Sequence, residues 1–253
     1  MNRIKKIKEY YNWGGRFLND EFHKKAKIIS ENEINKRPFR YDVINYLLEI
    51  LKRETTYLEI GVRNPEGNFN KINANTKYSV DPGLEFKSNP VDFKLTSDHF
   101  FQKLDQGEIL NKKIKFDVIF IDGLHTAEQV DKDILNAFRY IQNDGFIVLH
   151  DCNPPTEFHA RESHQYRISP AMSQWNGTVW KAYLKHRNNP AISSCCIDSD
   201  FGIGILTKGI DLGGQPIISN PFYEYSILDD NRTNSLNLLC FEEFKMKIEG
   251  SKI

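Results

Sequence analysis

The chain has 253 residues, and 40% of them are hydrophobic, which is enough to bury the core of one large domain. Its 34 basic and 34 acidic side chains cancel, so the overall charge predicts neither nucleic-acid binding nor attraction to an anionic membrane, and any charged partner must be met by a local site. No apolar run approaches the roughly 20 residues that span a bilayer, and the polar N-terminal stretch lacks the core of a secretion signal. We therefore expect a cytoplasmic protein without a membrane span, with its four cysteines reduced because they follow no CxxC pattern.

The first 54 residues favour helix. They are rich in Lys, Glu, Asn and aromatic residues, and the part from Tyr41 to Leu51 carries apolar side chains at helical spacing. From Thr56 the pattern changes to short apolar runs separated by helical patterns. The predicted strands are Tyr57 to Gly61, Tyr78 to Asp81, Asp92 to Leu95, Val118 to Asp122 and Phe146 to Asp151.

A helix is predicted after His125, where the apolar residues Val130, Ile134, Ala137, Phe138 and Ile141 fall on one face. The turn residues 143–145 then lead into the next strand. A strand, a helix and a strand at this spacing indicate a parallel crossover. The fold class is therefore α/β, with a mainly parallel, Rossmann-like sheet and helices on both faces.

Two further apolar runs, Ile192 to Ile197 and Phe201 to Thr207, flank a turn-forming Asp198-Ser199-Asp200 and predict an antiparallel hairpin at one edge of the sheet. We expect three parts: a helical lead-in over 1–54, a catalytic domain over 55–210, and a C-terminal tail over 211–253 that includes a short helix around 241–248.

The segment FDVIFIDGLH, from Phe116 to His125, is the most informative stretch. Its run of β-branched and aromatic residues is typical of a strand covered on both faces, and Asp122 falls at the carboxyl end of that strand. In open α/β sheets ligands bind outside these ends, so Asp122 and His125 are candidates for catalysis. The alternative is that Asp122 caps the next helix and His125 is a solvated loop residue.

A second candidate site follows the first predicted strand, in the sequence EIGVRNPEG. A glycine at Gly61 lets the backbone approach a ligand, and Asp81 at the end of the next strand suits two ribose hydroxyls. This spacing fits a nucleoside cofactor, although the GxGxxG and GxxxxGK[ST] patterns are both absent, which argues against a nicotinamide oxidoreductase and a phosphate loop. The alternative is a glycine turn with a capping aspartate.

The ordered series EIG, VDP, TSDHFF, FDVIFIDGLHTAEQV and GFIVLHDCNP resembles the class I S-adenosylmethionine-dependent methyltransferases, in particular the bacterial group associated with O-methylation of sugars, polysaccharides and natural products. The resemblance covers residues from about 40 to 210. It implies S-adenosylmethionine as cofactor. The implied cofactor contacts are Glu59 and Gly61 on the methionine side, Asp81 on the ribose, Ser97 and Asp98 beside the adenine with Phe100 as a stacking neighbour, and Asp122.

At the active site the chain resembles the metal-dependent sugar O-methyltransferases of macrolide pathways. The resemblance implies that Asp122, His150 and Asp151 bind Mg²⁺ or Mn²⁺ and that His125 acts as the base, with Asp122 also taking part in catalysis. His150 stands where those enzymes have an acid, which lowers the charge of the site. The alternative is that His150 is a satisfied histidine at a strand end.

Residues 153–187 form a Pro-, His- and aromatic-rich segment directly after Asp151, which we interpret as a substrate lid. Its aromatic and cationic side chains suit a sugar or a phosphate, and the candidate substrate contacts are Arg161, Tyr166, Arg167 and Trp175. The alternative is that Trp175, Val179 and Trp180 pack a helix onto the sheet.

The sequence thus predicts a methyltransferase whose acceptor is a hydroxyl of a sugar, a nucleotide-sugar or a glycosylated metabolite. Methylation of a phosphate or a nitrogen without metal, and a noncatalytic nucleoside-binding protein, are the alternatives. Small molecules are the expected partners, nucleic acid is not, and a homo-oligomer is left open.

Overall fold

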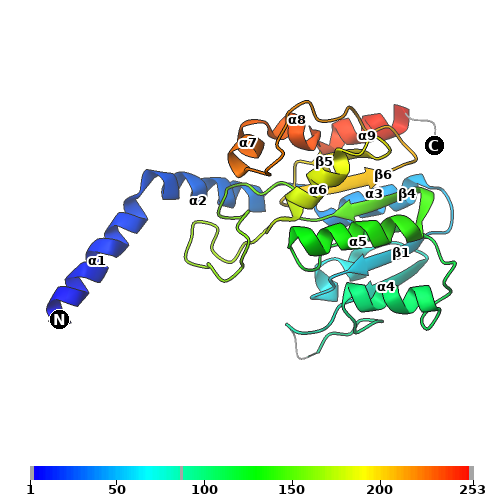
Figure 1. The fold of residues 1–253 in the computed structure, drawn as a ribbon, viewed down its shortest axis with the longest axis horizontal. Helices are drawn as coiled ribbons and strands as arrows, with labels where there is room; N and C mark the ends of the chain where they lie inside the picture. The colour runs from blue at the N-terminus through cyan, green and yellow to red at the C-terminus, as the bar shows by residue number, and fades with distance from the viewer. Residues whose placement is uncertain (1–2, 86–87, 251–253) are drawn as a thin grey trace.

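The computed structural model describes residues 3–85 and 88–250, and a seven-stranded sheet lies at its centre (Figure 1). The strand order is β2-β1-β3-β4-β6-β5-β7. The strands are β1 (Thr56–Ile60), β2 (Thr76–Val80), β3 (Phe116–Ile121), β4 (Ile141–Leu149), β5 (Ser193–Ile197), β6 (Ile203–Thr207) and β7 (Leu238–Leu239).

The strands β2, β1, β3 and β4 are parallel neighbours, and β6 runs antiparallel to both β4 and β5. This arrangement confirms the predicted Rossmann-like α/β fold with a mainly parallel sheet and an antiparallel hairpin. The hairpin is not the last element of the sheet, because the two-residue strand β7 pairs in parallel with β5.

Helices cover both faces of the sheet. In chain order the helical elements are α1 (Arg3–Asn19), α2 (Glu21–Ile34), α3 (Arg40–Ile50), η1 (Pro65–Gly67), η2 (Phe69–Lys71), α4 (Ser97–Gln106), α5 (Ala127–Tyr140), α6 (Val179–Arg187), α7 (Tyr225–Asp230), α8 (Arg232–Leu236) and α9 (Phe241–Gly250). One apolar cluster joins the sheet to α4, α5 and α6, and a second joins the opposite face to α3 and α9. Every residue of β3 is buried, as the unbroken apolar run predicted.

The structure corrects two of the predicted strands. Residues 92–95 form no strand; Phe93 makes only an isolated bridge to Val80, and the Asp92 carboxylate instead accepts hydrogen bonds from the backbone and hydroxyl of Ser79. β4 begins at Ile141, before the predicted turn, because Ile141 pairs with Phe116 ahead of an irregularity in the ladder.

The N-terminal helix α1 extends away from the rest of the molecule (Figure 1). It buries none of its residues. Among the residues that the structure describes, no helix combines the length and the apolar character needed to cross a membrane.

Candidate active site at the carboxyl ends of the strands

Two neighbouring parallel strands bring four polar side chains to one edge of the sheet. β3 ends before Asp122, and β4, which pairs with it in register, ends before His150 and Asp151. The backbone of Asp151 has φ of 63°, a left-handed conformation that is uncommon for a residue with a side chain and that turns the chain sharply at the strand end. The sequence prediction that these residues come together is therefore realised in the structure.

His125 lies between the two aspartates. Its Nε2 is 3.3 Å from Oδ1 of Asp122, and its Nδ1 is 3.1 Å from Oδ2 of Asp151 and 2.8 Å from the carbonyl oxygen of Trp175. Since every partner is an acceptor, both ring nitrogens donate, and the imidazole carries its second proton in this arrangement. The Trp175 ring stacks on the same imidazole, with the ring centroids 5.2 Å apart.

His150 is held differently. Its Nδ1 is 3.3 Å from both Asp122 and Asp151, while its Nε2 is 3.0 Å from Nη1 of Arg40. Burial and the Arg40 charge would lower the pKa of His150, but Asp151, Asp122 and Asp200 raise it well above its usual value. Nε2 of His150 also lies 3.4 Å from Oδ1 of Asp200. Both nitrogens of His150 are therefore engaged with protein groups.

Arg40 and Asp200 complete the cluster, and the sequence analysis missed both. Arg40 opens α3 and donates to the Asp200 carboxylate at 3.0 Å, while its Nε lies 3.7 Å from Asp122. Asp200 lies in the turn between β5 and β6 and also accepts from the Arg40 backbone. A turn aspartate and an arginine at a helix start are common in any sequence, so no local signal identified them.

The electrostatics of the cluster favour ionised acids. Burial alone would raise the pKa of Asp122, but His150, His125 and the Arg40 charge together hold it well below its usual value. Burial likewise lowers the pKa of His125, but Asp151 and Asp122 outweigh this effect and raise it to about 9. The cluster is thus a set of carboxylates neutralised by cations of the protein itself.

The donor set suits a divalent ion. Ligand atoms from Asp122, His125 and Asp151 all lie within 4.8 Å of one another. Two carboxylates and an imidazole fit Mn²⁺ well and Mg²⁺ through the oxygens. Arg40 lies 3.0 Å from Nε2 of His150 and leaves that nitrogen little room for an ion, and the predicted set of Asp122, His150 and Asp151 stays a prediction.

Glycines fix the loops around the cluster. Gly61 has φ of 93°, and a Cβ there would lie 2.2 Å from the backbone oxygen of Asp122. Gly177 has φ of 61°, and its Cβ would lie 2.1 Å from the backbone oxygen of His125. The turn at Gly61 is therefore needed for the close packing of two strand ends, in addition to any ligand that it approaches.

The predicted methionine-side acid, Glu59, is buried. Its Oε2 accepts hydrogen bonds from the Tyr57 hydroxyl at 2.6 Å and from the Asn68 amide at 2.8 Å. Burial raises the pKa of Glu59 to about 7, although these two hydrogen bonds oppose the shift. A contact between this carboxylate and a cofactor stays a prediction.

The other predicted cofactor residues lie at the ends of neighbouring elements. Asp81 follows β2, is partly exposed, and accepts from the backbone of Gly83 and the side chain of Asn89. Ser97 and Asp98 begin α4 rather than end a strand, and both accept from Gln129 of α5.

Phe100 is not available as a stacking neighbour. Its side chain is fully buried, and its ring packs against Phe93 and Phe101 in the core. This part of the predicted adenine site is therefore wrong, because α4 turns the ring inward.

The predicted lid residues separate into two kinds. Arg161 donates to the backbone oxygens of Phe158 and Gln174, and its own carbonyl accepts from Nε1 of Trp175, so these two residues brace the loop. Tyr166 and Arg167 are exposed and lie farther along the same segment.

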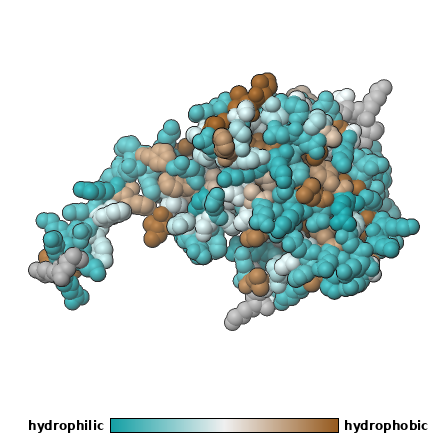
Figure 2. Space-filling model, viewed as in Figure 1, coloured by the Kyte–Doolittle hydropathy of each residue, from teal (hydrophilic) through white to brown (hydrophobic). Residues whose placement is uncertain are grey.

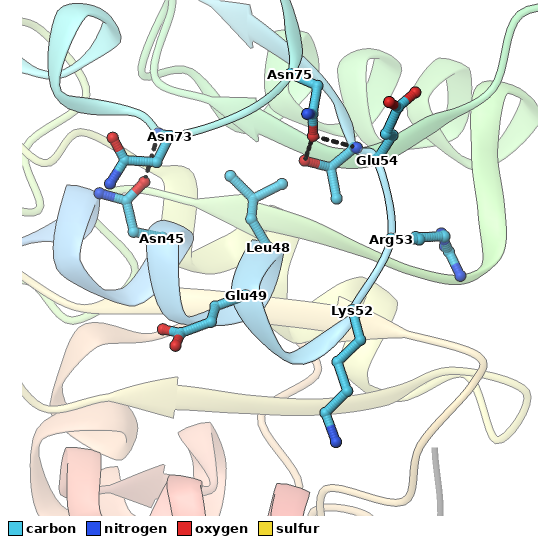
Figure 3. A pocket seen from close by; sticks show the side chains of 9 residues that line it. Asn45, Leu48, Glu49, Lys52, Arg53, Glu54, Asn73 and Asn75 are labelled. Atoms are coloured by element: carbon cyan, nitrogen blue, oxygen red, sulfur yellow. Dashed lines mark hydrogen bonds between the residues drawn. The ribbon is translucent and has the colours of Figure 1, made fainter.

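Two cavities in the described part of the chain differ in their relation to this cluster. The larger of the two, of about 580 Å³, lies at the opposite edge of the sheet, between the end of α3 and the start of β1 (Figure 3). Part of its lining consists of Asn45 and Asn75, whose side-chain oxygens accept hydrogen bonds from backbone amides of the protein. A smaller one, of about 140 Å³, is lined by Arg40, Asp200, Gly67 and neighbouring residues. Of these two cavities, the smaller one adjoins the carboxylate cluster.

Residues 45–152, somewhat less than half of the chain, match a family model described as a methyltransferase domain. The chain contains a methyltransferase domain. The matched segment runs from α3 to just past β4 and includes Gly61, Asp81, Asp122, His125 and Asp151. The prediction that the protein is a methyltransferase is thereby confirmed.

Several solved structures are similar to the methyltransferase at low identity. An O-methyltransferase from Bacillus cereus in complex with SAH is 12% identical, with a TM-score of 0.42 over 74% of this chain and 90% of that one. A putative caffeoyl-CoA O-methyltransferase from Staphylococcus aureus is 17% identical, with a TM-score of 0.40 over 80% and 99%. The MycE methyltransferase of the mycinamycin biosynthetic pathway, in complex with Mg, SAH and mycinamycin VI, is 13% identical, with a TM-score of 0.40 over 82% and 65%.

At these identities and TM-scores the solved structures support neither a substrate nor a cofactor for this methyltransferase. No curated protein matches its sequence.

Proposed function

We propose that this methyltransferase uses S-adenosylmethionine to methylate a hydroxyl of a sugar, a nucleotide-sugar or a glycosylated metabolite. The observation that carries the proposal is the position of His125, which lies between Asp122 and Asp151 at the carboxyl edge of the sheet. Ligands of open α/β sheets bind at this edge, and a hydroxyl acceptor needs a base there.

The proposed cofactor site lies along the same edge, at the ends of β1 and β2. S-adenosylmethionine, when bound, supplies an electrophilic methyl group, so the protein has only to align the acceptor and remove its proton. Asp81 is the proposed ribose contact because its carboxylate is partly exposed beside the Gly61 turn. Glu59, Ser97, Asp98 and Asp122 are the further proposed contacts.

His125 is the proposed general base. It must lose a proton before it can take one from the acceptor, and in the arrangement described here Asp151 and Asp122 hold that proton on it. Neutralising the two carboxylates would lower the pKa of the imidazole and free one of its nitrogens. The pKa of the proposed base therefore depends on the charges of Asp122 and Asp151.

A divalent ion is the proposed source of that neutralisation. Asp122 and Asp151 would hold it, which leaves His125 free as the base instead of serving as a third ligand. An ion in this position would supply charge that orients vicinal hydroxyls and lowers their pKa. His150, which donates to both carboxylates, would orient them from behind.

The acceptor would be covered by the segment 153–187. Trp175 stacks on His125 and so forms one wall beside the proposed base. Tyr166 and Arg167 are exposed and are the proposed contacts that close on the acceptor, while Arg161 is proposed to act by bracing the loop.

A metal-independent reaction is the second candidate, and Arg40 is the observation that favours it. This guanidinium already lies within the acid cluster, 3.0 Å from Asp200 and 3.7 Å from Asp122. It can therefore supply a fixed positive charge at the position where the first candidate requires an ion. A phosphate or nitrogen acceptor would be compatible with such a site.

The test measures release of S-adenosylhomocysteine from S-adenosylmethionine with a panel of nucleotide-sugars and glycosides. We expect turnover that chelator abolishes and Mg²⁺ or Mn²⁺ restores, and a loss of about 10²- to 10⁴-fold in kcat for His125→Gln. His99→Gln, which changes an exposed histidine on α4, serves as the matched control and should retain full activity. Turnover that survives chelator would establish the second candidate, and tight S-adenosylhomocysteine binding without turnover of any acceptor would favour a noncatalytic binding protein.

A further inference from the structure

The helix α1 lacks the packing that normally stabilises a helix in a protein. It spans 17 residues, none of them buried, and it extends away from the sheet domain (Figure 1). Isolated helices of this length are marginal in water, and the adjacent Gly14 and Gly15 each cost about 1 kcal/mol relative to alanine. A helix with this composition needs a partner surface to be stable.

One side of α1 is apolar. Ile7, Tyr11 and Leu18 recur at the spacing that places side chains on one face of a helix, and they are 59%, 81% and 71% exposed. Tyr10 borders this face, whereas Trp13 lies about 140° around the helix, among the charged residues. Both side chains are largely exposed. Figure 2 shows the projecting arm with hydrophilic and hydrophobic side chains both open to solvent. We call the stripe of Ile7, Tyr11 and Leu18 the apolar face of α1.

The remaining side of α1 is strongly basic. Five cationic residues and one acid lie on the helix: Arg3, Lys5, Lys6, Lys8, Arg16 and Glu9. The chain as a whole is neutral, so this positive charge is concentrated locally and not a property of the whole surface. A basic polar side beside an apolar face with a tyrosine at its border is the pattern of helices that lie in a bilayer interface.

We infer that α1 is a peripheral membrane anchor that lies flat on a bilayer containing anionic lipids. Its apolar face would enter the boundary between headgroups and acyl chains, with Tyr10 at headgroup level, and its lysines and arginines would contact the lipid phosphates. This inference is compatible with the finding that no described helix can span a membrane, because an interfacial helix does not cross the bilayer.

A second copy of the chain fits the same face less well. Two α1 helices packed together would put five cationic residues and one acid from each helix on one helix pair, which increases the repulsion between like charges. The two glycines also interrupt the apolar stripe where a helix pair would need side chains to interlock. An anionic surface, in contrast, is complementary to the charge.

The experiment is flotation of the full-length protein with lipid vesicles. Vesicles of phosphatidylcholine with about 30% phosphatidylglycerol are compared with vesicles of phosphatidylcholine alone, and the anionic set is repeated in about 0.5 M salt, where surface charges are screened within a few ångströms. Two double variants are compared. Tyr11→Ser/Leu18→Ser introduces serine at two positions of the apolar face, and Asn12→Ser/Asn19→Ser introduces serine at the next position in each case, on the polar face. Circular dichroism of the thermal transition checks that both variants fold.

We expect the natural chain to float with anionic vesicles at least about tenfold more than with neutral ones, and to lose this binding in high salt. The apolar-face variant should lose binding while the polar-face variant keeps it. Absence of flotation with anionic vesicles would overturn the inference. It would also be overturned if light scattering showed a dimer that Tyr11→Ser/Leu18→Ser dissociates, since a second copy would then cover the face.

Discussion

Asp122 accepts from two histidines and lies beside a guanidinium, so three cationic side chains converge on one carboxylate. Removing any one cation leaves a buried acid with less compensation, which is costly in a site of low dielectric. A metal ion that binds at Asp122 and Asp151 must therefore compete with His125 for the same oxygens. The affinity of the proposed metal site depends on how readily that imidazole gives up its second proton.

The second proton on His125 should make the free energy of unfolding depend on pH. Its pKa is about 9 in the folded protein and about 6.5 in an unfolded chain, so the folded state holds the proton more tightly. The resulting stabilisation is fully present below pH 6.5 and is lost as the pH rises through 9. We expect the difference in unfolding free energy between the natural chain and His125→Gln to shrink by about 3 kcal/mol between pH 6 and pH 10.

Urea unfolding in metal-free buffer at the two pH values measures this difference. His99→Gln, outside the cluster, should alter the unfolding free energy by the same amount at both pH values. A difference for His125→Gln that stays constant or grows with pH would mean that the aspartates do not hold a proton on the imidazole.

At the scale of elements, the site is built by the close approach of turns that follow neighbouring strands. The turn after β1 meets the turn after β3 at Gly61, and the lid segment meets the latter turn again at Gly177. Both glycines have a positive φ and leave no room for a side chain. The distance between the proposed cofactor turn and the proposed base is thereby fixed by backbone contact.

Gly61→Ala should accordingly damage both stability and the site. Its Cβ would overlap the backbone of Asp122 in a backbone conformation that alanine rarely adopts, so we expect a loss of about 2–4 kcal/mol in unfolding free energy. Gly67→Ala, on the same turn but with no atom within 4 Å of the added Cβ, is the matched control. Equal denaturation midpoints for the two variants would show that the turn has room to move.

At the scale of the whole molecule, the chain divides into a packed sheet domain and a projecting helix. The helices α3 to α6 and α9 bury apolar faces on the sheet, whereas α1 buries nothing. The stability of the domain and the presence of α1 should therefore be nearly independent, and removing the helix should leave the cooperative transition in place.

Deletion of residues 1–19 tests this independence. We expect the midpoint of thermal unfolding to change by an amount corresponding to about 1 kcal/mol or less, as for surface changes in general. Leu47→Ala, in the fully buried part of α3, is the contrasting variant, with an expected loss of about 2–5 kcal/mol. A large drop in midpoint for the deletion would mean that α1 packs on the domain.

The sequence by itself determined the features that depend on local pattern. The apolar run of β3 specified a strand buried on both faces, and the position of Asp122 and His125 directly after that strand specified the edge of the sheet at which they lie. The alternation of apolar runs and helical patterns was sufficient for the α/β fold, because periodicity reports burial directly. It failed at 92–95, where a short apolar stretch packs as an extended loop.

Only the tertiary structure decided which groups surround Asp122 and His125. Arg40 and Asp200 lie 160 positions apart in sequence, and they meet at His150 because α3, β4 and the β5–β6 turn converge at one edge of the sheet. Their contact places a guanidinium at Nε2 of His150, and for this reason we propose that His150 orients the carboxylates. The physical reason is that hydrogen-bond partners and pKa shifts depend on distances of a few ångströms between side chains, and these distances arise only when distant segments pack together.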